Sequence, residues 1–166
     1  AIASTILEAL YFLLLMYAYT DHDRSSPVEL GFGWMFKNIE TDDRPFIGRE
    51  AIRREIKDGT SRWKLVGLLV DWQHWDQLYR EAGLITPKDE TPLDYESMLY
   101  DDDGERIGYA TSLMYSPVLQ RHIAIAKLRP DLAATGTTVN LEVTVNRQAS
   151  SVRAIVSRLP HFNPER

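Results

Sequence analysis

The chain has 166 residues, of which 44% are hydrophobic and 26% are charged, and its formal net charge is −5 at pH 7. This composition is that of a folded globular protein, and the length suits one domain or two small ones. The negative charge and the scattered lysines and arginines argue against nucleic acid and anionic lipid as partners. The chain has no cysteine, which excludes disulfides, thiolate nucleophiles and cysteine-based zinc sites, and is compatible with a cytoplasmic location.

An apolar run at 9–19 comes first along the chain, directly after Glu8. Its 11 uncharged residues fall short of the roughly 20 that a membrane-spanning helix needs. No basic segment precedes it and no small-residue cleavage site follows it, so a signal peptide is not indicated either. We predict a buried strand, or a strand plus turn, with a buried helix as the alternative.

A short surface helix and the start of a β unit come next. In 48–57, Ala51, Ile52 and Ile56 share one stripe with charges elsewhere, and the stretch ends at Asp58-Gly59. In 62–71, the alternate residues Val66, Leu68 and Val70 predict one buried face of a strand. We therefore place a domain boundary near 60–61.

The stretch 72–94 interrupts the β pattern. Apolar residues at helical spacing predict a helix that ends near Gly83, and Pro87 and Pro92 predict irregular chain after it. Further strands are expected at 95–100, 106–115, 122–129, 138–146 and 151–159, with a tight hairpin turn at Asp103-Gly104. Many short strands with turns between them are typical of a sandwich or a barrel.

No stand-alone catalytic motif is visible. The acidic residues of 101–104 are contiguous rather than alternate, which does not suit a calcium loop, and the glycines of 31–33 lack the pattern of a phosphate loop. The four histidines lie far apart without metal-ligand spacing. No serine lies in a G-x-S-x-G elbow.

Two sequence signatures resemble the glycine-cleavage T-protein (aminomethyltransferase) family. The first is GERIGYATSLMYSP at 104–117 followed by VLQRHIAIAK at 118–127, similar to the family's G-x-x-(I/V)-G-x-x-T-S-G, S-P and I-A-(L/I)-A. The second is SPVELGFGW at 26–34 with PFIGREA at 45–51, similar to T-P-x-E-x-G-L-G-W and D-F-I-G-K-E-A-L. The resemblance implies an α+β remnant of the folate-binding domain at 1–60 and an all-β antiparallel barrel at 61–166, with an insertion at 72–94.

The resemblance also implies candidate folate-binding residues. Glu8 lies in ILEA, similar to the family's L-E-A-G, whose glutamate accepts hydrogen bonds from the pterin ring; Leu10 replaces the glycine. A carboxylate suits this role because it can accept two adjacent N–H donors. From the residue alone, Glu8 could equally occupy an exposed edge. Arg44 lies where relatives carry an arginine or lysine facing the folate, although an exposed loop arginine is the alternative.

The family's known members are more than twice as long, so we expect this chain to be the C-terminal part of such a protein, inactive alone and prone to self-association through its apolar run. The resemblance implies a tetrahydrofolate-dependent transferase of one-carbon metabolism that takes a methyl or aminomethyl group from an amine, aryl ether or sulfonium donor, in a demethylase-like or uncharacterised branch. The alternatives are the folate module of a flavin-dependent dimethylglycine or sarcosine oxidase and a non-catalytic interaction barrel. Phe162 is expected to pack in the core.

Overall fold

The computed structural model describes residues 24–41, 44–93 and 96–164 of the chain. Glu8 and the apolar run at 9–19 therefore lie outside the described residues. In chain order, the elements are η1 (Val28–Phe32), η2 (Gly33–Phe36), α2 (Arg49–Asp58), β1 (Lys64–Val70), α3 (Trp72–Glu81), β2 (Ser97–Tyr100), β3 (Arg106–Ser116), β4 (Arg121–Leu128), η3 (Pro130–Leu132), β5 (Thr138–Val145) and β6 (Gln148–Ser157). Within the described ranges, no helix has the length and apolar character needed to cross a membrane.

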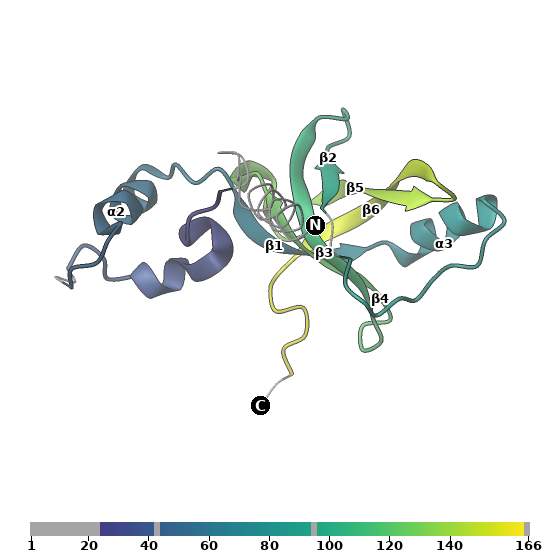
Figure 1. Cartoon of the computed structure of the whole chain (residues 1–166), viewed down its shortest axis with the longest axis horizontal. Coiled ribbons are helices and arrows are strands. Elements are labelled where there is room, and N and C mark those ends of the chain that lie inside the picture. Colours follow the sequence, from purple (N-terminus) through teal and green to yellow (C-terminus); the bar gives the residue numbers. More distant parts are fainter. Residues whose placement is uncertain (1–23, 42–43, 94–95, 165–166) are drawn as a thin grey trace, which may run out of the picture.

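The six strands form a closed antiparallel barrel in the order β1-β4-β3-β2-β5-β6 (Figure 1). The barrel closes because β1 pairs on one side with β4 and on the other with β6. As the alternation predicted, Val66, Leu68 and Val70 all point into the core and are at most 5% exposed. The predicted antiparallel barrel is thus confirmed, and the helix predicted over 48–57 corresponds to α2.

The β2–β3 hairpin has the tight turn that the sequence predicted. The Asp101 carboxylate accepts hydrogen bonds from the backbone N–H groups of Asp103 (3.1 Å) and Glu105 (2.8 Å). Gly104 adopts a φ of 81°, which few other residues tolerate. Gly108 has a different role, because a Cβ atom there would lie 2.2 Å from the Lys127 carbonyl oxygen. Only glycine therefore lets β3 approach β4 at this point.

The stretch at 72–93 covers one end of the barrel. It begins with α3, whose N-cap Asp71 accepts hydrogen bonds from the backbone of Gln73 and His74. The chain then returns along β3, where Tyr115 N–H donates to the Asp89 carbonyl at 2.8 Å and Leu93 N–H donates to the Leu113 carbonyl at 2.9 Å. The predicted helix is confirmed, and these bonds fasten the irregular chain that follows it.

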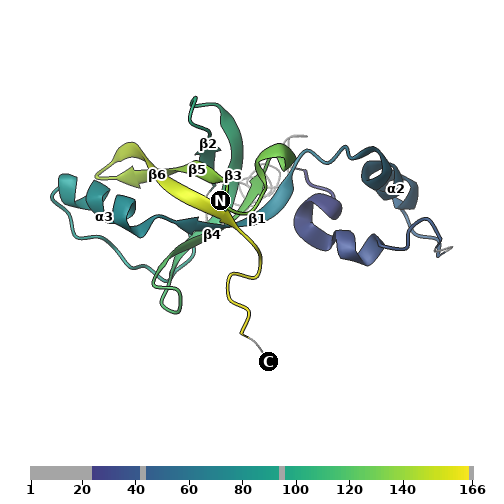
Figure 2. The same cartoon turned by 180° about the vertical axis from the view of Figure 1, so that it is seen from behind.

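Residues 24–60 lie on the opposite side of the barrel from α3 (Figures 1 and 2). The connection is centred on the buried Glu29, whose carboxylate accepts hydrogen bonds from the N–H groups of Ser26 (3.0 Å), Arg62 (2.7 Å) and Trp63 (3.3 Å). Glu55 on α2 adds a second link, because its Oε1 accepts hydrogen bonds from the hydroxyls of Ser26 and Ser61, both at 2.6 Å. The helical segment is thus joined to the start of β1 by two carboxylates.

The tail after β6 is attached through His161 and not through Phe162. One ring nitrogen of His161 lies 3.0 Å from the Ala124 carbonyl oxygen and the other lies 3.3 Å from the Ser157 hydroxyl. Phe162 is 56% exposed, so the expectation that it packs in the core is wrong. The chain after β6 runs away from the barrel (Figure 1), which leaves this ring outside the core.

Candidate functional site

The first candidate site is a hollow in the helical segment, between η2 and α2. It has a volume of about 310 Å³ and is lined by Met35, Phe36, Ile39, Arg44, Pro45, Phe46 and Arg49. The residues come from three consecutive pieces of chain, and Arg44 lies on the piece that connects η2 to α2. Arg44 is thus an exposed loop residue that lines a concave surface.

The hollow combines aromatic walls with two guanidinium groups. The rings of Phe36 and Phe46 face one another at a tilt, with centroids 6.2 Å apart. Arg49 donates a hydrogen bond from Nη2 to the Ile39 carbonyl at 3.1 Å, which fixes α2 against the chain after η2. Arg44 is exposed. Aromatic surface beside positive charge suits a flat aromatic molecule that carries an anionic group.

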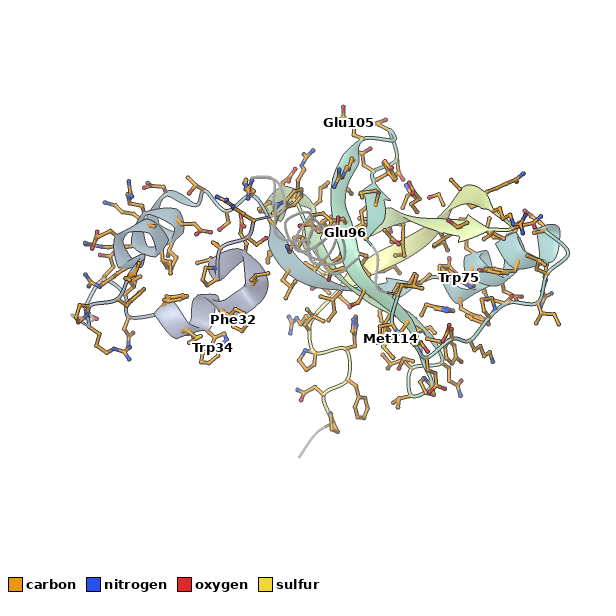
Figure 3. All side chains as sticks on the ribbon, viewed as in Figure 1. Phe32, Trp34, Trp75, Glu96, Glu105 and Met114 are labelled. Atoms are coloured by element: carbon orange, nitrogen blue, oxygen red, sulfur yellow. The ribbon has the colours of Figure 1, made fainter. Side chains whose placement is uncertain are left out.

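An exposed apolar surface surrounds this hollow. Phe32, Trp34, Met35 and Phe46 are each about half exposed, and Ile47 is fully exposed. In Figure 3, Phe32 and Trp34 lie close together on the helical segment and away from the barrel. Scattered apolar side chains are ordinary on a protein surface, but a gathering of this kind marks a face that contacts another molecule or another part of a protein.

The structure brings together only part of the predicted site. Glu8 lies outside the described residues, so its position relative to Arg44 remains a prediction. Glu29, which the sequence analysis treated only as a motif residue, emerges as the buried connector to the barrel. A local signal could have identified it, because Ser26 and Glu29 have the spacing of a capping box. In the structure, Glu29 N–H donates to Ser26 Oγ at 3.1 Å, and Ser26 N–H donates to Glu29 Oε2.

A second cavity lies at the other end of the molecule, under α3 and the chain that follows it. Its volume is about 160 Å³, and its lining includes Trp75, Tyr79, Asp89, Leu113 and His122. His122 is 4% exposed and stacks on Trp75, with ring centroids 4.3 Å apart. Burial lowers the pKa of His122 to about 4, against a smaller opposing effect of the Asp89 charge. The imidazole is therefore neutral at pH 7.

The described residues contain no group of three or more histidine or acidic side chains placed to hold a metal ion. From the sequence we predicted a strand from His122 onward and no metal role for the histidines, and the cavity was not predicted. No local sequence pattern predicts this contact, because Trp75 and His122 are 47 positions apart and meet only when α3 folds over the end of the barrel.

Together, the fold and the first hollow define a class of protein: a closed six-stranded antiparallel barrel preceded by a helical segment with a basic and aromatic surface. Residues 64–163 match the glycine cleavage T-protein C-terminal barrel domain, and the chain belongs to this family. Aminomethyltransferases are among its curated relatives. That of Synechococcus sp. (strain RCC307) is 31% identical over 83% of this chain and 32% of the relative. That of Bacteroides thetaiotaomicron is 30% identical over 87% and 34%, respectively.

A solved structure supports the same fold. The glycine cleavage system aminomethyltransferase T from Bartonella henselae superimposes with a TM-score of 0.58 at 22% identity, covering 83% of this chain and 32% of that one. The family resemblance seen in the two signatures is thus confirmed. The chain spans about a third of the length of these relatives.

Proposed function

We propose that this chain forms the C-terminal part of a tetrahydrofolate-dependent aminomethyl- or methyltransferase. The observation that carries this proposal is the family match over the barrel at 64–163, joined to the second signature at 26–51. The parent enzyme would bind reduced folate and take a one-carbon unit from an amine, aryl ether or sulfonium donor. Because the folate nitrogen is itself the nucleophile, proximity and orientation would supply most of the rate.

In this proposal the chain is divided at 60–61. Residues 1–60 are the end of the folate-binding domain, residues 61–166 are the barrel domain, and 72–94 is an insertion. The hydrogen bonds of Glu29 to Arg62 and Trp63 would hold the two parts in a fixed relation. The barrel would then be a rigid support for the edge of the folate site.

Arg44 and Glu8 are the residues of this chain that we assign to folate. Glu8 would accept hydrogen bonds from the pterin N–H groups, as a carboxylate can accept two donors at once. Arg44 lines the hollow that contains Phe36 and Phe46 and would pair with an anionic carboxylate of the folate. The exposed apolar surface around the hollow would be covered by other parts of the folate-binding domain.

The test is a chimera in which this chain replaces the aligned 138-residue stretch of the Synechococcus relative. We expect tetrahydrofolate binding, measured by calorimetry, and a weakening of at least tenfold, about 1.4 kcal/mol, for Arg44→Ala and for Glu8→Ala. Arg54→Ala is the matched control, because Arg54 is exposed on α2 and bonds to the Glu50 carbonyl of its own helix. A folded chimera in which Arg44→Ala and Glu8→Ala leave folate affinity unchanged would contradict the assignment.

The isolated chain should bind tetrahydrofolate no tighter than about millimolar, near −4 kcal/mol. One or two anchoring residues contribute a few kcal/mol at most, and this is offset by the lost translational and rotational freedom of the ligand. Micromolar affinity for the isolated chain, measured by the same calorimetry, would mean that the folate site lies within these residues alone.

A further inference from the structure

The cavity beneath α3 has the dimensions of a single aromatic ring. Its volume of about 160 Å³ is close to the roughly 150 Å³ of an engineered protein cavity that holds one benzene molecule. It is lined by α3, by the returning chain at 87–93 and by strands β2, β3, β4 and β5, with Pro87, Leu93, Leu113 and Val143 among its apolar walls. The exposed residues Pro87, Asp89 and Thr91 mark the side on which it opens to solvent.

Aromatic side chains form one wall of the cavity. The rings of Trp75 and Tyr79 lie nearly parallel, with centroids 5.8 Å apart, and Trp75 and His122 are stacked at 4.3 Å. Trp75 lies on α3 and Met114 on β3 (Figure 3), and both residues line the cavity. Parallel and edge-on aromatic contacts add to the energy of simple burial, so this wall favours a flat ring.

Buried polar atoms lie in the same wall. His122 Nδ1 and Trp75 Nε1 are both buried, and neither has a hydrogen-bond partner among the described residues. A neutral imidazole carries one nitrogen that donates a hydrogen bond and one that accepts. Since burial keeps His122 neutral at pH 7, it can accept a hydrogen bond from a ligand in the cavity. Buried polar groups in native proteins are usually paired, so a donor on a ligand in the cavity would give His122 Nδ1 the partner that it lacks among the described residues.

The charge at the rim narrows the ligand class. Asp89 is exposed and lines the cavity, and two hydrogen bonds from Thr91 lower the pKa of its carboxyl, so it is ionised at neutral pH. A ligand that carries its own carboxylate would be repelled there. A neutral molecule would not be.

We propose that this cavity is a binding site for a neutral single-ring aromatic molecule with one hydrogen-bond donor, of the phenol class. The ring lies against Trp75 and Tyr79, and its donor bonds to His122. The site is independent of the proposed folate function, because α3 and the hollow at Arg44 lie on opposite sides of the barrel (Figure 1).

The test uses the 166-residue chain and three probes of similar size: phenol, toluene and benzoate. Toluene replaces the hydroxyl of phenol by a methyl group, and benzoate adds negative charge. The indole N–H signals of the four tryptophans are followed by ¹H–¹⁵N NMR, with the Trp75 signal assigned from the Trp75→Phe variant. Phenol should shift the Trp75 signal and leave that of the distant Trp34 unmoved. Toluene should bind about 3–10-fold more weakly, and benzoate should not bind.

His122→Phe is the matched variant, because it keeps a stacked ring and removes both nitrogens. In this variant the affinity for phenol should fall to that for toluene or below it, because its buried hydroxyl would lose its acceptor, while the affinity for toluene stays the same. If His122→Phe does not fold, the comparison of phenol with toluene in the unaltered chain decides the matter alone. Equal binding of phenol and toluene, or no shift of Trp75 with either, would overturn the proposal.

Discussion

The barrel and the helical segment before it differ in how far they bury their apolar side chains. In the barrel at 64–157, alternating side chains from all six strands meet in one interior, and Leu68, Leu99 and Leu141 are fully buried. In the described part of 24–60, the only buried residues are Glu29, Ile39 and Ile52, while large apolar side chains face outward. The barrel thus contains its own core, whereas the helical segment leaves large apolar side chains exposed on its surface.

This difference shows how an autonomous unit differs from a dependent one. A closed barrel pairs every strand on both sides, so its backbone and side chains are satisfied within one stretch of sequence. The three short helices described in 24–60 cannot enclose a core, and they depend on neighbouring structure for most of their stability. Polar contacts of Glu29 and Glu55 hold the segment to the barrel, but they do not replace a core.

The two regions should differ most when one side chain is truncated in each of them. Leu68→Ala removes a side chain with 0% exposure and should lower the free energy of unfolding by about 2–5 kcal/mol. Met35→Ala, at 57% exposure, should change it by less than about 0.5 kcal/mol. Urea denaturation followed by far-UV circular dichroism measures both. Similar losses for the two variants would mean that the helical segment has a core of its own.

Acid should destabilise the barrel through His122. Burial disfavours the charged ring and lowers the pKa of His122 to about 4 in the folded chain. In the unfolded chain the pKa has its ordinary value of 6.5. Between these values the unfolded chain binds a proton that the folded chain does not, so stability falls as the pH falls from about 6.5 to about 4. The full loss is up to about 3 kcal/mol at 1.36 kcal/mol per pKa unit.

The comparison with His122→Phe isolates this contribution from that of the carboxylates. The variant should lose less stability than the unaltered chain between pH 6.5 and pH 4, as measured by urea midpoints across this range. Parallel pH dependence in the two proteins would show that His122 ionises normally in the folded state.

Sequence reasoning predicted the barrel well because its signals are local. Alternation identified the inward face of β1, and the turn residues Asp103 and Gly104 identified the hairpin, so each strand could be found from its own residues. The stacked pair of Trp75 and His122 could not be predicted in this way, since no local pattern records that the first turn of α3 meets the start of β4. The prediction for Phe162 was wrong for a related reason, because aromatic character favours burial but cannot show that the chain after β6 runs away from the barrel.

Removing the Glu29 carboxylate should loosen the helical segment without unfolding the barrel. Glu29→Ala leaves the N–H groups of Arg62 and Trp63 without their acceptor, at a cost of about 1–3 kcal/mol to the local connection. Limited proteolysis should then cut faster near 58–61 and leave the barrel intact. Glu50→Ala is the matched control, as Glu50 is an exposed glutamate on α2. Faster cleavage inside 104–157 would place the weak point in the barrel instead.

The smallest effect on stability, and the clearest test of the exposed face, should come from Trp34→Ser. Trp34 is 64% exposed, so its replacement should change the free energy of unfolding by less than about 0.5 kcal/mol. The same side chain belongs to the apolar surface with Phe32 and Met35, which two copies of the chain can bury against each other. Light scattering over a range of concentrations should therefore show association that Trp34→Ser weakens, whereas Val118→Ser, a similarly exposed apolar position in the barrel region, leaves it unchanged. If the unaltered chain stays monomeric throughout, this face does not drive self-association.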